Sequence, residues 1–160
     1  MIYFGAVAVI FGAYMMWREY AVFLDKELLW CRTFLRALSD YREKIKCYMD
    51  TPSSWACGYN DRYLSECGFL DRLMDGDNFS DAYRNSCGKL ILTDTTEDAL
   101  NSCFERLGDG YLDTELEVIE QALEKLSREE GRISEDLLKR RKAAGAVLGA
   151  FASGIIILII

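Results

Sequence analysis

Charged side chains are absent from both ends of this 160-residue chain. None occurs in residues 1–17 or 143–160, so all 19 Lys and Arg and all 26 Asp and Glu residues lie between those segments. An uncharged, mainly apolar run of 17 or 18 residues is close to the length with which an α-helix crosses the apolar layer of a bilayer, about 30 Å. We therefore expect an N-terminal transmembrane helix at 1–17, a soluble helical domain at 18–142 and a C-terminal transmembrane helix at 143–160.

A cleaved secretory signal peptide is the alternative for the first segment. Such a peptide has a basic start and a cleavage site of small residues, whereas this run begins at the first residue and ends in Met-Met-Trp-Arg. A buried core helix is the alternative for the last segment, although that run has no polar face. The transmembrane interpretation is favoured for both.

The C-terminal apolar run is directly preceded by four cations: Lys139, Arg140, Arg141 and Lys142. Basic residues gather on the cytoplasmic side of membrane helices, and Arg18 and Lys26 likewise follow the first run. We expect the middle domain in the cytoplasm and both termini outside. Beyond the cations, Gly145 and Gly149 form a small-residue stripe that would let another helix approach closely, and a homo-oligomer is among the assemblies considered.

Two long helices are predicted at the borders of the middle domain. In each, apolar residues recur at alternating steps of four and three, which is typical of a helix that packs along one seam. The first seam holds Leu24, Leu28, Cys31, Leu35, Leu38, Ile45 and Met49, and the second holds Leu112, Leu116, Ile119, Leu123, Leu126, Ile133 and Leu137. Thr51 and Pro52 should end the first helix and start another, with Thr51 as the cap and Pro52 in the first turn.

The two long helices must run antiparallel if both meet the same membrane face. The membrane boundaries select the register in which paired residue numbers add up to about 161. The expected seam pairs are Leu24 with Leu137, Leu28 with Ile133, Leu35 with Leu126 and Met49 with Leu112.

Each seam is interrupted by one charged residue, Arg42 in the first helix and Glu130 in the second. A lone buried charge is costly, so Arg42 should reach Glu117 or Glu120, and Glu130 should reach Arg32 or Lys26. The favoured alternative is that both side chains extend into solvent from a loose seam.

Residues 51–110 are divided by glycine-rich breaks and are expected to form short helices, the clearest from about Thr96 to Leu107 with Thr95 or Thr96 as its cap. This region has 5 basic and 11 acidic residues. A solvated acidic surface is the favoured interpretation, and a docking face for a basic partner is the alternative. That face would comprise Asp71, Asp75, Asp77, Asp81, Asp94, Glu97 and Asp98.

The composition argues against several kinds of chemistry. The chain has no histidine, which excludes histidine-dependent catalysis and histidine-ligated metal sites. The net charge of −7 disfavours nucleic-acid binding. No glycine-rich phosphate loop precedes a lysine, and 75–81 departs from a calcium-binding loop. The six cysteines form no Cys-x-x-Cys pair and are expected to be reduced and buried. We expect no enzyme, cofactor or metal.

Three stretches together suggest a family. They are Leu35-Arg36-Ala37-Leu38 leading to Thr51-Pro52, then Leu123 to Leu126, and the tail with its basic cluster, Gly145-x-x-x-Gly149 and aliphatic end. In these features the chain resembles stage III sporulation protein AB of endospore-forming bacteria. The resemblance implies an all-α bundle similar to the cytoplasmic domain of the type II secretion F component. It also implies a place in the mother-cell membrane facing the forespore.

The function implied by this resemblance is that of a non-catalytic platform in the sporulation channel complex between mother cell and forespore, beside other proteins of that complex and a secretion-type ATPase. Two alternatives stay open at this point. One is a thiol-based membrane redox protein that uses the cysteines, and the other is a general membrane scaffold outside sporulation.

Overall fold

The computed structural model describes the backbone of residues 2–86, 90–108 and 111–159, and the side chains of the same residues except 2–10, 12–13 and 144–159. All regular structure in these ranges is helical, with seven α-helices and no strand. The predicted all-α class is therefore confirmed for the described residues.

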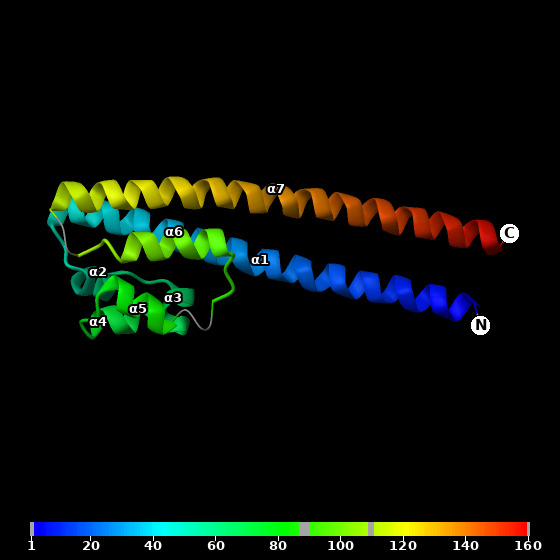
Figure 1. Ribbon diagram of the computed structural model, residues 1–160, viewed down its shortest axis with the longest axis horizontal. Helices are drawn as coiled ribbons and strands as arrows, with labels where there is room; N and C mark the ends of the chain where they lie inside the picture. Colours follow the sequence, from blue (N-terminus) through cyan, green and yellow to red (C-terminus); the bar gives the residue numbers. More distant parts are fainter. Residues whose placement is uncertain (1, 87–89, 109–110, 160) are drawn as a thin grey trace. The chain divides into compact units, whose positions relative to one another are not determined.

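The chain divides into two compact units. The first comprises residues 1–26 and 131–160, and the second comprises residues 27–130. Helices α1 (Ile2–Tyr48) and α7 (Leu112–Ile159) each contribute to both units, whereas all the short helices belong to the second (Figure 1).

Five short helices connect α1 to α7, as the glycine-rich breaks predicted. They are α2 (Pro52–Gly58), α3 (Arg62–Cys67), α4 (Phe69–Met74), α5 (Phe79–Ser86) and α6 (Asp94–Phe104). Thr51 caps α2 with its hydroxyl oxygen, which accepts a hydrogen bond of 3.2 Å from the Ser54 N–H, and Pro52 occupies the first turn. Gly68 allows the direct turn from α3 to α4 because its φ of 83° suits a residue without a Cβ.

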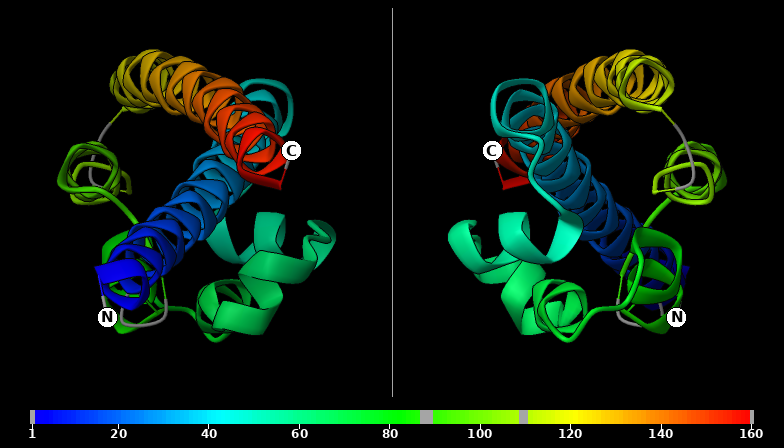
Figure 2. Two further views of the ribbon diagram at one scale, coloured as in Figure 1. Left: turned by 90° about the vertical axis from the view of Figure 1, so that its right-hand side faces the viewer. Right: turned by 90° about the vertical axis from the view of Figure 1, so that its left-hand side faces the viewer.

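Aromatic side chains fill the centre of the second unit, where the helices surround a common core (Figure 2). Phe34 of α1 is fully buried, and its ring lies 5.8 Å from those of Phe69 and Tyr83 and 6.0 Å from that of Phe104. The indole N–H of Trp55 donates a 2.8 Å hydrogen bond to Asp40, which satisfies its polar group. The contacts of Phe34 tie α4, α5 and α6 to α1 through one side chain.

The predicted antiparallel register is present in the second unit. Arg32 contacts Glu130 and Arg42 contacts Glu120, and the residue numbers of each pair add up to 162. The Cys31 thiol also donates to the backbone oxygen of Leu126 at 3.3 Å, which joins the same two helices. In the first unit, Leu24 and Leu137 are both buried, as expected of seam residues.

One seam prediction is wrong. Met49 is 76% exposed and does not pack as a seam residue. The helix α1 ends at Tyr48, and Met49 has a φ of 54°, a left-handed conformation that turns the chain out of the helix before the side chain can join the seam.

The bounds predicted for the clearest short helix are also corrected. Helix α6 begins at Asp94 rather than near Thr96, has Thr93 as its N-cap residue, and ends at Phe104 rather than Leu107. Thr96 is buried, and its hydroxyl lies 3.3 Å from that of Thr93. The start is displaced because the Thr93 N–H donates to a carboxylate of α1, which satisfies that N–H without a local cap.

Within the described residues, no helical stretch combines the length and the apolar character needed to cross a membrane. The predicted transmembrane helices at 1–17 and 143–160 fall largely on residues whose side chains lie outside the described part, and they stay predictions.

Candidate functional site

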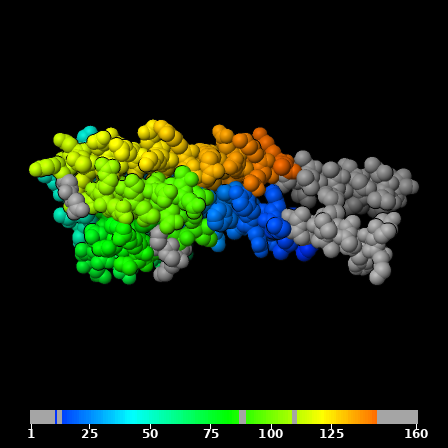
Figure 3. Space-filling view, viewed as in Figure 1, coloured from blue at the N-terminus to red at the C-terminus, as the bar shows by residue number. Residues whose placement is uncertain are grey.

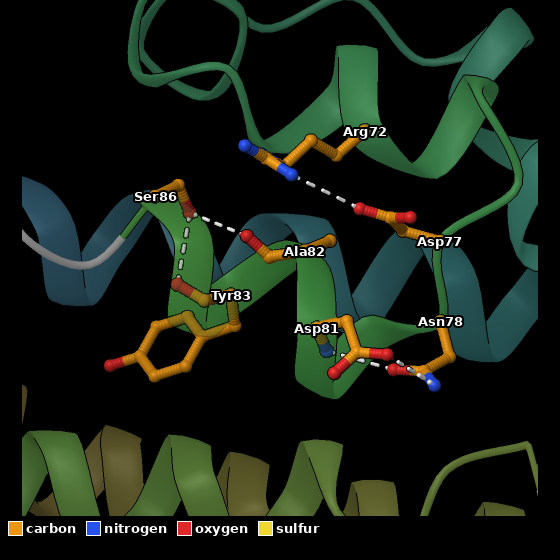
Figure 4. Close-up of polar contacts among 7 residues, drawn as sticks. All are labelled: Arg72, Asp77, Asn78, Asp81, Ala82, Tyr83 and Ser86. Carbon is orange, nitrogen blue, oxygen red and sulfur yellow. Dashed lines mark hydrogen bonds and ion pairs between the residues drawn. The ribbon is translucent and has the colours of Figure 1, made fainter.

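Four residues of the proposed acidic face lie on α4, on α5 and on the turn between them. Asp71 and Asp75 are exposed, and neither forms an ion pair with a described residue. Asp77, in contrast, lies 3.3 Å from the guanidinium of Arg72 (Figure 4). Asp81 donates its N–H to the Asn78 side chain at 2.8 Å and accepts from that side chain at 3.0 Å. Asp77 and Asp81 therefore have local structural roles, which leaves Asp71 and Asp75 as the members available to a partner.

The other three residues of the acidic face lie at the start of α6. Asp94 and Glu97 are in its first turn, and Asp98 follows directly. All three are exposed and form no ion pair with a described residue. Carboxylates at this end of a helix are stabilised by the helix dipole, so their position also has a structural explanation. The predicted face thus consists of two acidic groups on different helices.

Glu27 of α1 is a buried carboxylate that the sequence did not single out. Its side chain is fully buried, and Oε1 accepts a 3.3 Å hydrogen bond from the Thr93 N–H at the start of α6. The other oxygen, Oε2, is buried without a hydrogen-bond partner. Its spacing of three and four residues from Leu24 and Cys31 is the signal that could have placed it on the buried face.

The two seam charges form the ion pairs named as expectations. Arg32 Nε lies 2.7 Å from Glu130 Oε1, and Arg42 Nη1 lies 3.8 Å from Glu120 Oε1. The side chains in these pairs keep between 29% and 66% of their surface exposed, so they also extend outwards as the solvated alternative proposed. Such exposed pairs contribute little stability.

The basic residues at the predicted membrane boundary belong to the first unit. Lys139 lies 3.4 Å from Glu135, and Arg141 lies 3.4 Å from Asp25. The Arg140 guanidinium lies over the Tyr20 ring, 4.1 Å from its centroid, and Lys142 is exposed without an ion pair to a described residue. Two of the four cations are therefore balanced by carboxylates.

The remaining residues of the family resemblance occupy ordinary helix positions. Leu38 is buried, Leu35 is half-buried against the core, and Arg36 is exposed. Gly145 and Gly149 lie in α7, but their surroundings are outside the described residues.

Cys31, Cys47, Cys57 and Cys103 are free thiols. Cys31, Cys67 and Cys103 are buried, whereas Cys47 and Cys57 are exposed, contrary to the expectation of burial. Burial raises the pKa of Cys103 to about 12, and burial with the nearby Glu130, Glu129 and Glu27 carboxylates raises the pKa of Cys31 to about 12. A raised pKa makes a thiol a poor nucleophile, the opposite of what thiol-based redox chemistry needs.

A cofactor or metal site is not evident in the part of the chain that the structure describes. No three Cys, Asp or Glu side chains there are grouped so that they could hold a metal ion. A shallow depression between α6 and α7 is lined by residues that include Cys103, Arg106 and Lys125. It does not bring the acidic groups together.

An exposed apolar tip was missed by sequence reasoning. Tyr48, Met49 and Tyr111 are 72%, 76% and 89% exposed where α1 ends and α7 is about to begin. The seam pattern placed Met49 in the core, and no local signal distinguished the two tyrosines from buried aromatic residues.

Comparison with known proteins supports the fold. No family model and no curated protein matches the chain. Among solved structures, stage III sporulation protein AB is similar, with a TM-score of 0.60 and 16% identity over 71% of this chain and 97% of that protein's chain. At this identity the likeness shows a shared fold, which agrees with the resemblance suggested by the sequence.

Proposed function

We propose that this chain is a non-catalytic membrane platform of the sporulation channel complex between mother cell and forespore. The observation that carries this proposal is the likeness to nearly the whole chain of stage III sporulation protein AB. In this role the uncharged segments at 1–17 and 143–160 anchor the chain in the mother-cell membrane facing the forespore. The helical unit of residues 27–130 lies on the cytoplasmic side in this proposal, as a bundle similar to the cytoplasmic domain of the type II secretion F component.

The docking surface in this proposal is acidic and faces a basic partner in the complex, a secretion-type ATPase. Its first group consists of Asp71 and Asp75, which have no internal ion pair among the described residues. Its second group consists of Asp94, Glu97 and Asp98 on α6, which likewise have no ion pair with a described residue. Carboxylates without internal partners keep their full charge available for an oppositely charged surface.

Charge reversal of each group tests the docking surface. One variant carries Asp71→Lys and Asp75→Lys, and a second carries Glu97→Lys and Asp98→Lys. Co-purification of the ATPase with the full-length chain from sporulating cells should fall at least tenfold for the variant that alters the contact. Spore yield should fall with it. A double variant with both reversals that retains the ATPase at the normal level would discard the acidic surface as the docking site.

A matched control keeps the same change in charge at another place. Glu43→Lys with Glu117→Lys reverses two exposed carboxylates on α1 and α7, and this variant should retain the ATPase.

Deletion of the gene tests whether the chain is a platform for sporulation or a general membrane scaffold. A defect confined to sporulating cells supports the proposal, and an equal defect in growing cells would favour the scaffold.

Reagent accessibility tests the membrane placement. All six cysteines lie between the two uncharged segments. A membrane-impermeant thiol reagent applied to intact cells should leave the exposed Cys47 and Cys57 unlabelled until the membrane is permeabilised. Strong labelling of those two thiols in intact cells would overturn the cytoplasmic placement.

A further inference from the structure

Exposed apolar side chains are concentrated in the first unit, although residues 27–130 contribute most of the described side chains. Seven of the twelve large apolar side chains that are exposed in the described part of the chain belong to this unit: Phe11, Tyr14, Met15, Met16, Tyr20, Val22 and Leu138. The described surface that carries them is blue for α1 and orange for α7 in Figure 3. Exposed apolar surface gathered in one part of a protein marks a contact with a partner or a bilayer.

This apolar surface continues past the charged residues that end the uncharged segments. On α1, Tyr20 and Val22 follow Arg18 and are 44% and 46% exposed. On α7, Leu138 precedes the basic cluster and is 56% exposed. Val22 lies seven residues after Met15, so both are on one face of α1. The boundary that the charges indicate is therefore not the end of the exposed apolar surface on either helix.

Aromatic side chains lie at the same level, and one of them contacts the other helix. The guanidinium of Arg140 on α7 lies over the Tyr20 ring of α1, 4.1 Å from its centroid. The rings of Tyr14 and Trp17 lie 6.2 Å apart on the preceding turns. Tyrosine and tryptophan have an apolar body and a polar end, which suits the boundary between lipid headgroups and acyl chains. Arginine has the same character, with an apolar stem and a charged end.

The first unit is basic, whereas the second is acidic. Residues 1–26 and 131–160 hold seven basic and four acidic side chains, a net charge of +3, and residues 27–130 hold 12 basic and 22 acidic side chains, a net charge of −10. Three of the four carboxylates in the first unit form ion pairs, which are Asp25 with Arg141, Glu135 with Lys139 and Asp136 with Arg132. The fourth, Glu19, follows Arg18 and is exposed without an ion pair to a described residue. Four cations thus lack a carboxylate partner within the described residues.

We propose that an interfacial band of the first unit lies in the headgroup layer of an anionic bilayer. This interfacial band consists of Trp17, Tyr20 and Val22 on α1 with Leu138 and Arg140 on α7. The inference rests on the proposed function, because the segments placed there in the bilayer continue into the band within α1 and α7. It adds that lipid contact extends about one helical turn beyond the uncharged segments, as far as Val22 and Leu138.

A bilayer suits the interfacial band better than a second copy of the chain does. The excess positive charge of the first unit is attracted to anionic headgroups. A second copy anchored in the same membrane would bring the same charge of +3 to the same level, and like charges repel each other. The acidic second unit is repelled by an anionic surface, which leaves the first unit as the part that contacts it.

Fluorescence quenching by nitroxide-labelled lipids tests the interfacial band on the full-length chain in phosphatidylglycerol vesicles. The signal of Trp17 is the difference between the original chain and Trp17→Phe, and that variant is also the background for Val22→Trp, Leu138→Trp or Tyr48→Trp. Tyr48 is the matched control, because it is an exposed aromatic residue of the second unit. With the nitroxide near the ester groups, the reporters at 17, 22 and 138 should be quenched at least about threefold more than the reporter at 48.

The part played by lipid charge is measured with the same reporters. Replacing phosphatidylglycerol by phosphatidylcholine removes the negative charge of the headgroups. Quenching at positions 22 and 138 should then fall by about half or more, because the attraction that holds the band in the headgroup layer is lost. Equal quenching at these positions in both kinds of vesicle would overturn the assignment to an anionic surface.

The pattern of quenching separates failure of this inference from failure of the proposed function. Quenching at positions 22 and 138 no greater than at position 48 would overturn the interfacial band, and continued quenching of Trp17 would then show that anchoring itself stands. Absence of quenching at all these positions, with extraction of the chain by carbonate, would contradict the proposed membrane placement as well. Disulfide crosslinking between chains that carry Val22→Cys, without quenching at position 22, would show that a second copy covers this face instead.

Discussion

Replacing Phe34 by alanine should destabilise the second unit more than any change at its surface. The Phe34 side chain is fully buried, and its ring lies within 6.0 Å of three other rings, those of Phe69, Tyr83 and Phe104. Truncating a buried phenylalanine removes its transfer free energy and leaves a cavity, which together cost about 3 to 5 kcal/mol. This is a large part of the total stability of a typical domain, about 5 to 15 kcal/mol.

The reactivity of the Cys103 thiol reports the loss of stability in Phe34→Ala without requiring complete unfolding by denaturant. It is 2% exposed and lies beside Phe104 in α6, so an alkylating reagent reaches it only when the core opens. When closing is faster than labelling, the rate follows the opening equilibrium. A loss of 3 to 5 kcal/mol then accelerates labelling of Cys103 by about 10² to 10⁴-fold, since each 1.4 kcal/mol is a factor of ten.

The assay is pulsed alkylation of the full-length chain in mild detergent at pH 7.5, with each cysteine quantified by mass spectrometry. Exposed Cys57 is the internal reference and should label at the same rate in both proteins. Tyr48→Ala is the control, because that side chain is 72% exposed at the tip and should leave the Cys103 rate nearly unchanged. Acceleration of Cys103 by less than about tenfold in Phe34→Ala would refute the view that this side chain is central to the core.

Three further changes test other parts of the structure. Thr51→Ala removes the hydroxyl that accepts from the Ser54 N–H and should cost about 1 kcal/mol in urea unfolding, whereas Thr51→Ser should be nearly neutral. In a double-mutant cycle, Arg32→Ala and Glu130→Ala should show a coupling of about 0.2 to 1 kcal/mol, and zero coupling would contradict the contact. Burial raises the pKa of Cys103 from 9.0 to about 12, so the unfolded chain loses this proton first as the pH rises. The contribution of Cys103 to the free energy of unfolding should be complete below pH 9 and be lost towards pH 12. The urea midpoint should therefore fall over this pH range, and Cys103→Ala should make that fall smaller.

The long helices and their register could be predicted because they follow from a repeated signal. Alternating apolar steps define a seam over many turns, and the charged interruptions at Arg42 and Glu130 find acidic and basic partners in the same register. The Thr51-Pro52 pair predicted the start of α2 for a similar reason, since both the cap and the fixed φ of proline act within one turn.

The tip and the acidic face could not be predicted as fully. Met49 continues the apolar pattern by one more step, but the helix ends before it, and a seam pattern does not show where its last member lies. Among the acidic residues, composition could not separate Asp77, which pairs with Arg72, from Asp71, which has no ion pair within the described part of the chain. That difference depends on how α4 and α5 meet.

Glu27 explains why the start of α6 was misplaced. A local cap would be sought in the threonines at 95 and 96, but the Thr93 N–H instead donates to a carboxylate 66 residues earlier in the chain. Burying a carboxylate is costly, and the positive end of the α6 dipole together with this hydrogen bond offsets part of that cost. The same contact fixes α6 against α1, so the helix begins where Glu27 can accept from it. The first residue of α6 depends on a partner distant in the sequence, so no local sequence signal marks it. The same buried contact also determines where the acidic group of α6 lies.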